Sequence, residues 1–124
     1  LPQKIIKKRI LIIDEFGLLS SLYKYCDVAF IGGGFRGALH NTLEAAVWDL
    51  PIIYGKNNNN KKFNEISHLE NLRIGFPITS GNEFKLLINR IVKYGDIGSG
   101  GNKFILKNSG ATDKIIRETI NLIK

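Results

Sequence analysis

The sequence predicts an α/β fold, in which helices cover both faces of a parallel sheet. Two observations favour this fold: short apolar runs alternate with amphipathic segments, and a glycine-rich stretch joins one apolar run to the next amphipathic segment. Continuous apolar runs are typical of strands buried on both faces, and short strand–helix–strand connections favour parallel strands. A chain of 124 residues, 44% of them hydrophobic, has room for one core of ordinary size. We therefore expect a single domain over residues 1–124.

The expected strands are the apolar runs of the sequence. Each run is followed by turn-forming residues, such as Asp14 to Gly17 after the first and Gly55 to Asn60 after the third. The four predicted strands are residues 9–13, 28–31, 50–54 and 74–78.

Helices are expected where apolar residues recur at intervals of three and four. The clearest case runs from Phe84 to Val92, and Ser80 and Glu83 precede it in the form of a capping box. The segment from Tyr94 to Gly101 is predicted to be a loop. The predicted helices are residues 18–25, 41–48, 61–72, 82–94 and 111–123.

Charge and composition exclude some classes of protein. The net charge is +7, but the basic residues are spread along the chain, so binding to nucleic acid is not expected. The one tight basic group is Lys4, Lys7, Lys8 and Arg9. No apolar run approaches the roughly 20 residues of a membrane span, and the single cysteine, Cys26, excludes an internal disulfide. A cytoplasmic location is expected. Because the chain opens with Leu-Pro next to a predicted core strand, we expect a C-terminal piece of a longer protein.

Residues 32–37 match the G-x-G-x-x-G pattern after a predicted strand. In a dinucleotide-binding unit this pattern cradles a pyrophosphate. That interpretation also needs an acidic residue near the end of the next strand, whereas this strand ends Tyr54-Gly55-Lys56. Two other interpretations stay open: a glycine-rich turn with a purely conformational role, and a general anion-binding site at a strand-to-helix junction.

The residues that follow the glycines have two interpretations each. Asn41 and Glu44 have the spacing of a capping box, but Glu44 is equally suited to accept hydrogen bonds from ribose hydroxyls. His40 is either a general acid or base or a structural loop residue, and Arg36 is either a phosphate or carboxylate clamp or a solvated side chain. Cys26 and His68 show no metal-ligand pattern, so no metal site is expected.

Several motifs in fixed order resemble one known family. Asp14, Gly17, Leu19, Leu22 and Tyr23 fit D-x-x-G-x-L-x-x-L-Y. Further along, residues 27–33 fit D-x-A-x-x-G-G, residues 40–46 fit H-N-x-L-E-x-A, and residues 108–111 fit N-x-G-A. Together they resemble the 3-deoxy-D-manno-octulosonic acid (Kdo) transferases, which add Kdo to lipid A precursors. The chain departs from the family pattern at Lys56, where a proline is usual, and in the run Asn57–Asn60.

The resemblance implies the Rossmann-like C-terminal half of a GT-B glycosyltransferase, which binds CMP-Kdo. The CMP-binding residues it implies are Phe16, Gly17, Leu18, Asn41, Thr42, Leu43 and Glu44, with Arg36 and His40 as possible phosphate or carboxylate contacts. It implies no cofactor and an inverting displacement whose base lies in an N-terminal domain absent here, so this chain alone should be inactive. That domain would bind the lipid A precursor and hold the enzyme on the cytoplasmic face of the bacterial inner membrane.

Two other classes of function stay open at this point. One is a non-catalytic α/β domain that binds a nucleotide or a protein partner. The other is a GT-B transferase that uses a different nucleotide sugar, such as a UDP-sugar.

Overall fold

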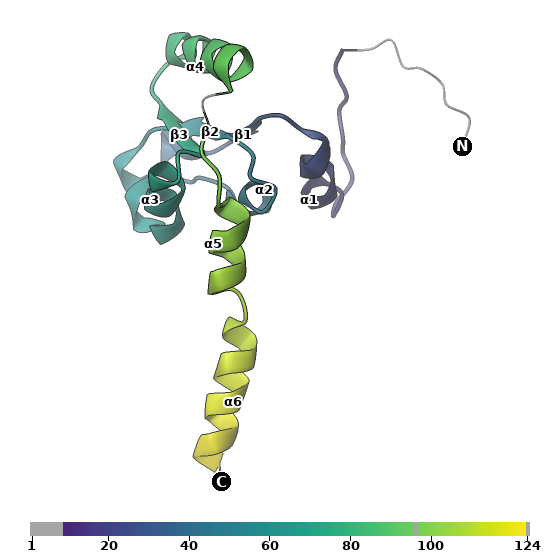
Figure 1. Cartoon of the computed structure of the whole chain (residues 1–124), viewed down its shortest axis with the longest axis vertical. Coiled ribbons are helices and arrows are strands. Elements are labelled where there is room, and N and C mark those ends of the chain that lie inside the picture. The colour runs from purple at the N-terminus through teal and green to yellow at the C-terminus, as the bar shows by residue number, and fades with distance from the viewer. Residues whose placement is uncertain (1–8, 96, 124) are drawn as a thin grey trace, which may run out of the picture.

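The computed structural model describes residues 9–95 and 97–123, which form a parallel sheet flanked by helices (Figure 1). The strands are β1 (Ala29–Ile31), β2 (Ile52–Gly55) and β3 (Gly75–Ile78), in the order β1-β2-β3. Ala29 lies opposite Ile52, and Ile52 lies opposite Gly75. The predicted α/β fold class is confirmed.

Both faces of the sheet carry a hydrophobic core. Helix α4 (Gly81–Tyr94) covers one face, where Ile53 and Ile78 pack with Ile91. On the other face α2 (Leu43–Ala46) and α3 (Asn64–Asn71) pack against Ile52 and Tyr54. Figure 1 shows α4 on one side of the strands and α2 and α3 on the other. The middle strand β2 is buried along its whole length, as its continuous apolar sequence predicts.

The predicted strand at residues 9–13 is wrong. This segment has no strand conformation, and its side chains are exposed, with Ile12 at 85% of its full accessible area. A strand needs hydrogen bonds from a neighbouring strand, and no strand of the described residues pairs with this one. The sheet therefore consists of the second, third and fourth predicted strands. Of the basic group noted above, Lys4, Lys7 and Lys8 lie outside the described residues.

The predicted helices agree with the structure, with three differences in their bounds. The predicted helix 61–72 starts later, because Asn58–Lys62 form the 3-10 turn η3 and Phe63 is extended, so that α3 begins only at Asn64. The segment 18–25 becomes α1 (Leu19–Leu22) and the 3-10 turn η1 (Tyr23–Tyr25). Helix α2 is shorter than predicted, because the chain turns after Ala46 and reaches a positive φ of 55° at Asp49.

Helix α5 (Gly101–Asn108) was not predicted, because its glycine-rich approach resembles a loop. The side chain of Asp49 holds the start of α5, where Oδ1 accepts from the backbone N–H groups of Gly100 at 3.0 Å and Asn102 at 3.2 Å. Gly101 itself packs against the carbonyl oxygen of Ala46, where a Cβ would lie 2.5 Å from that oxygen. The loop before α5 thus ends at a capped helix rather than continuing as a coil.

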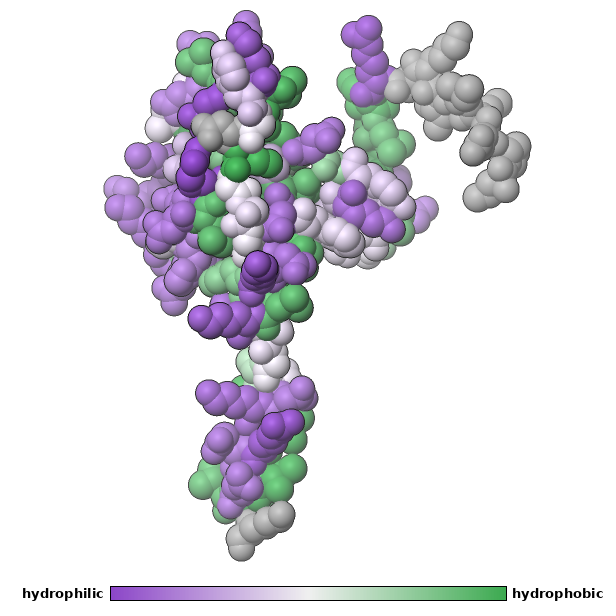
Figure 2. All heavy atoms as spheres, viewed as in Figure 1, coloured by the Kyte–Doolittle hydropathy of each residue, from purple (hydrophilic) through white to green (hydrophobic). Residues whose placement is uncertain are grey.

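Helix α6 (Ala111–Ile123) has the predicted bounds and extends away from the sheet beyond α5 (Figure 1). Hydrophobic side chains lie exposed along it, including Ile115, Ile120 and Leu122, and appear green in Figure 2. Within the part of the chain that the structure describes, no helix is both long and apolar enough to cross a bilayer.

The start of α4 predicts a dependence of stability on pH. The carboxylate of Glu83 accepts from the backbone N–H and the hydroxyl of Thr79, both at 2.7 Å, and these bonds lower the pKa of Glu83. A carboxyl pKa lowered by folding contributes stability that is present above its unfolded value and lost as the pH falls through its folded value. The melting temperature of the wild type should therefore fall more steeply than that of Glu83→Gln between about pH 5 and pH 3.

Thermal unfolding followed by circular dichroism measures this difference. Glu15→Gln is the matched control, because Glu15 is an exposed carboxylate for which the described residues provide no hydrogen bond. Equal acid slopes for the wild type and Glu83→Gln would contradict a stabilising role for the Thr79 bonds.

Candidate functional site

The glycine-rich loop after β1 is fastened to the end of β2. It contains the 3-10 turn η2 (Gly34–Arg36), flanked by Gly33 and Gly37 at φ of 82° and 70°. Gly34 packs directly on Gly55, since a Cβ on Gly34 would lie 2.5 Å from the Gly55 carbonyl oxygen. The positive φ angles and this close approach both require glycine, so these glycines have conformational reasons to be present.

Two asparagines hold this loop in place. The Nδ2 group of the buried Asn60 donates to the carbonyl oxygens of Gly34 at 3.1 Å and Gly55 at 2.9 Å. Asn57 Nδ2 donates to the carbonyl oxygen of Phe35 at 2.9 Å. The loop then passes through an irregular segment before α2, whereas a dinucleotide fingerprint opens directly into a helix. This geometry disfavours the dinucleotide interpretation.

Asn41 orders the start of α2 and holds the carboxylate of Glu44. Its Oδ1 accepts from the backbone N–H of Leu43 at 3.0 Å, while its Nδ2 donates to Glu44 Oε1 at 3.0 Å. A capping box would instead join the Glu44 carboxylate to the backbone N–H at the cap. Thr42 is buried at 2% exposure and its side chain makes no capping bond. One oxygen of Glu44 is thus held by Asn41, and the other has no hydrogen bond within the described residues.

Tyr23 lies near Glu44, although it belongs to a different element. The side chain is 8% exposed, and burial raises the pKa of its hydroxyl, with the negative charge of Glu44 adding to the effect. Tyr23 therefore stays protonated and can donate a hydrogen bond. Tyr23 is not among the site residues predicted from the sequence, although it belongs to the D-x-x-G-x-L-x-x-L-Y motif, which is the signal that could have identified it.

The structure brings some of the predicted site residues together and leaves others apart. A cavity of about 230 Å³ is lined by His40, Asn41 and Thr42, with Phe63 and Glu65 on its other side. The other predicted CMP residues do not line this cavity: Leu43 and Glu44 lie in α2, and Phe16, Gly17 and Leu18 are exposed in and beside the turn before α1. Arg36 is exposed in η2. The segment that contains Phe16, Gly17 and Leu18 is anchored through α1, since Trp48 Nε1 donates to the Ser20 carbonyl oxygen at 3.0 Å.

Asn41 and Glu44 are bonded to each other and supply an amide and a carboxylate at the start of α2, two groups that can form hydrogen bonds with hydroxyls. Helix α2 has only four residues, so its dipole is weaker than the predicted helix 41–48 would supply. Across residues 9–95 and 97–123, no three His, Cys, Asp or Glu side chains gather where they could hold a metal ion.

Comparison with known proteins places the chain among relatives of the glycosyltransferases. A bifunctional glycosyltransferase/methyltransferase of Fusobacterium nucleatum subsp. nucleatum is 29% identical over 118 residues, which are 94% of this chain and 18% of that protein. No protein-family model matches the chain.

Other relatives narrow this class. The Kdo transferase of Aquifex aeolicus is 35% identical over 79 residues, 60% of this chain and 21% of the relative. The Kdo transferase of Chlamydia pneumoniae is 42% identical over 48 residues, 37% of this chain and 11% of the relative. The chain spans about a fifth or less of the length of these proteins. It is related to glycosyltransferases and, among them, to Kdo transferases.

Proposed function

We propose that this chain is the donor-binding part of a Kdo transferase, which moves Kdo from CMP-Kdo to a lipid A precursor. The observation that carries the proposal is the similarity to Kdo transferases of different bacterial genera. The α/β fold supports it, because open parallel sheets bind ligands at the carboxyl ends of their strands, where the Asn41–Glu44 segment follows the β1 loop.

In this proposal CMP lies between the turn at Phe16–Leu18 and the start of α2. The Glu44 carboxylate, oriented by Asn41, accepts hydrogen bonds from the ribose hydroxyls through the oxygen that Asn41 leaves unbonded. Because α2 is short, the phosphate charge is met mainly by backbone N–H groups, and the basic side chains of the loop after β1 are Arg36 and His40.

The reaction is a direct displacement with inversion. The acceptor hydroxyl attacks the anomeric carbon of Kdo, the bond from that carbon to the CMP oxygen breaks, and a base takes the hydroxyl proton. The proposal assigns that base and the lipid acceptor to a domain outside this chain, and with them the attachment to the cytoplasmic face of the inner membrane. The chain alone is then expected to bind donor without turnover, because both domains must close to assemble the site.

Isothermal titration calorimetry with CMP, UDP and NAD tests the proposal. We expect CMP to bind most tightly and Glu44→Ala to weaken CMP binding about tenfold or more, the size expected for losing a hydrogen bond to a charged group. Glu118→Ala, on the exposed helix α6, is the control and should leave CMP binding unchanged. A preference for NAD, or CMP binding that is indifferent to Glu44→Ala, would reject the proposed site.

A second candidate is a GT-B transferase that uses another nucleotide sugar. The match to the Fusobacterium glycosyltransferase/methyltransferase favours it, because that match extends over 94% of this chain. A preference for UDP over CMP in the same titration would support this candidate. Absence of binding to any of the three nucleotides would favour a non-catalytic partner-binding domain instead.

A further inference from the structure

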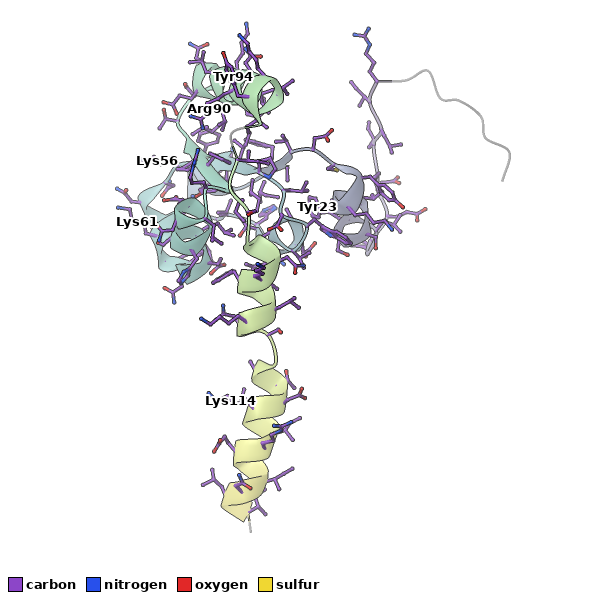
Figure 3. All side chains as sticks on the ribbon, in the orientation of Figure 1. Tyr23, Lys56, Lys61, Arg90, Tyr94 and Lys114 are labelled. Carbon is purple, nitrogen blue, oxygen red and sulfur yellow. The ribbon has the colours of Figure 1, made fainter. Side chains whose placement is uncertain are left out.

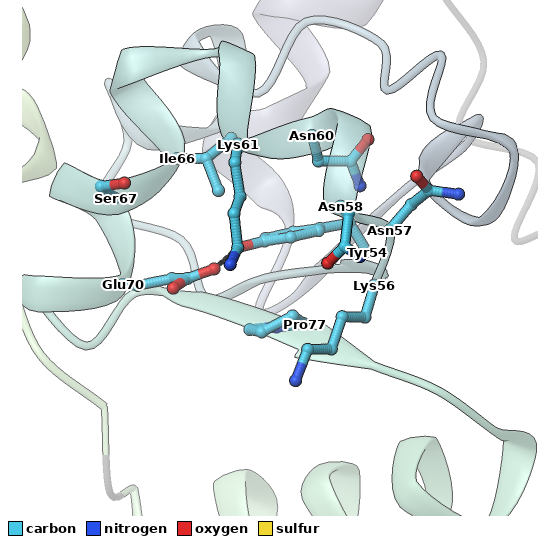
Figure 4. Close-up of a pocket in the computed structure, with 10 residues that line it drawn as sticks. All are labelled: Tyr54, Lys56, Asn57, Asn58, Asn60, Lys61, Ile66, Ser67, Glu70 and Pro77. Carbon is cyan, nitrogen blue, oxygen red and sulfur yellow. Dashed lines mark hydrogen bonds between the residues drawn. The ribbon is translucent and has the colours of Figure 1, made fainter.

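A second cavity, of about 470 Å³, lies beside the end of β2 and is distinct from the one at His40. Its volume is within the range of small-molecule sites. The two cavities share one lining residue, Ile66. The second cavity is formed by the end of β2, the 3-10 turn η3 (Asn58–Lys62), the adjoining helix α3 and the edge strand β3 (Figure 4).

Positive charge dominates the cavity. Lys56 and Lys61 line it together with one carboxylate, that of Glu70. Figure 4 shows Lys61 extending into the cavity from above, while Lys56 extends past Pro77 and across β3 in this view. Within the described residues neither lysine has a carboxylate oxygen within 4.0 Å, although Lys56 lies near enough to Glu83 to influence it. Two ammonium groups without an ion-pair partner make this cavity suited to an anion.

Uncharged polar groups line the rest of the cavity. The Tyr54 hydroxyl donates to Glu70 Oε1 at 2.6 Å, and burial together with this bond raises the pKa of Tyr54, so the hydroxyl stays protonated. Because Tyr54 is only 1% exposed, its role is to hold Glu70 in place, and the second Glu70 oxygen can accept a hydrogen bond from a ligand hydroxyl. Asn58 and Ser67 add an amide and a hydroxyl. A bare inorganic anion would leave these acceptors unused.

The remaining walls are apolar. Ile66 and Pro77 line the cavity and offer aliphatic surfaces to the C–H groups of a sugar ring. From these groups together, we propose that the cavity binds a small polyol that carries one negative group, either a sugar acid or a sugar phosphate. Lys61 binds the anionic group, the positive charge of Lys56 adds to the attraction, and Glu70 and Ser67 bind the hydroxyls. The inference is independent of the proposed CMP site.

Titration of the ¹⁵N-labelled chain, followed by two-dimensional NMR, tests this proposal with glucuronate, glucose 6-phosphate, glucose and inorganic phosphate as probes. We expect saturable shifts of the Asn58, Lys61 and Ser67 amides with at least one of the two anionic sugars, with a dissociation constant on the order of 1 mM. Whichever of the two binds more tightly identifies the anionic group. The proposal would be overturned if glucose bound as tightly as the two anionic sugars. It would also be overturned if inorganic phosphate bound as tightly as the two anionic sugars.

Two variants separate the contributions of charge and of hydroxyl recognition. Lys61→Gln should weaken the anionic sugars about tenfold, whereas Lys114→Gln on the distant helix α6 should have no effect (Figure 3). Glu70→Gln should strengthen binding of inorganic phosphate, because it removes a negative charge, and reduce the preference for sugar over phosphate. Equal binding by the wild type and Lys61→Gln would overturn the proposal. CMP titrated into Lys61→Gln should still shift the Asn41–Glu44 amides, and this result reports on the CMP site alone.

Discussion

Replacing Gly33 by alanine is expected to lower the free energy of unfolding by about 3 kcal/mol. Gly33 has a φ of 82°, which is unfavourable for a residue with a Cβ, and an added Cβ would overlap the carbonyl oxygen of Ala38. The loop is closed at this residue, since the Ala38 N–H donates to the Gly33 carbonyl oxygen at 3.1 Å, and moving Ala38 away would strain this bond. Urea denaturation followed by far-UV circular dichroism measures the loss.

The neighbouring glycine provides a matched control. Gly32 has no positive φ, and a Cβ built on it would meet nothing within 4 Å. Gly32→Ala should therefore change the free energy of unfolding by less than about 0.5 kcal/mol. If both variants were equally stable, the loop would not require glycine for its conformation. A ligand-binding role would then be the better explanation of the motif.

Replacing Asn60 by alanine is expected to cost about 2 kcal/mol of unfolding free energy, from two lost hydrogen bonds of about 1 kcal/mol each. Asn60 is 3% exposed and joins Gly34 in the glycine loop to Gly55 at the end of β2. Asn60→Asp keeps the size of the side chain but turns a carboxylate oxygen toward the carbonyl oxygens of Gly34 and Gly55, so that two acceptors repel where the amide donated. It should destabilise the fold at least as much as Asn60→Ala.

Asn59→Ala is the control for this pair of variants. Asn59 is exposed, and its backbone N–H donates a hydrogen bond to Asn57 Oδ1 at 2.9 Å. Replacing the side chain by alanine leaves this backbone bond in place. Equilibrium urea unfolding of all three variants gives the comparison. Wild-type stability in Asn60→Asp would mean that the two carbonyls do not depend on the Asn60 amide.

The strands that sequence patterns identified correctly are those whose neighbours lie within the described chain. Residues 28–31, 50–54 and 74–78 pair with one another in the sheet, and their apolar runs were sufficient signals. Residues 10–13 are equally apolar, but no strand of the described residues lies beside them, and strand formation depends on the neighbouring strand as well as on the run itself. Helix α5 was missed for a different reason, since Asp49, far away in sequence, caps it.

The candidate site shows a similar division. Spacing alone placed Asn41 and Glu44 on one turn, but it could not show that their side chains bond to each other. Tyr23 lies near enough to Glu44 to be influenced by its charge, and the bond of Trp48 to the Ser20 carbonyl oxygen holds the two segments together; neither has a local sequence signal. The run Asn57–Asn60 was predicted to be a polar turn, and nothing in its composition distinguishes the buried Asn60 from its exposed neighbours. The contacts of the predicted CMP residues with a nucleotide stay a prediction.

Trp48 gives the protein an intrinsic optical reporter. It is the sole tryptophan of the sequence, and its indole N–H is bonded to the Ser20 carbonyl oxygen of α1. Indole fluorescence responds to hydrogen bonding and solvent contact, so detachment of α1 changes both the wavelength and the intensity of its emission. The docking of the segment that precedes α2 can therefore be followed in the unlabelled protein during any titration or unfolding experiment.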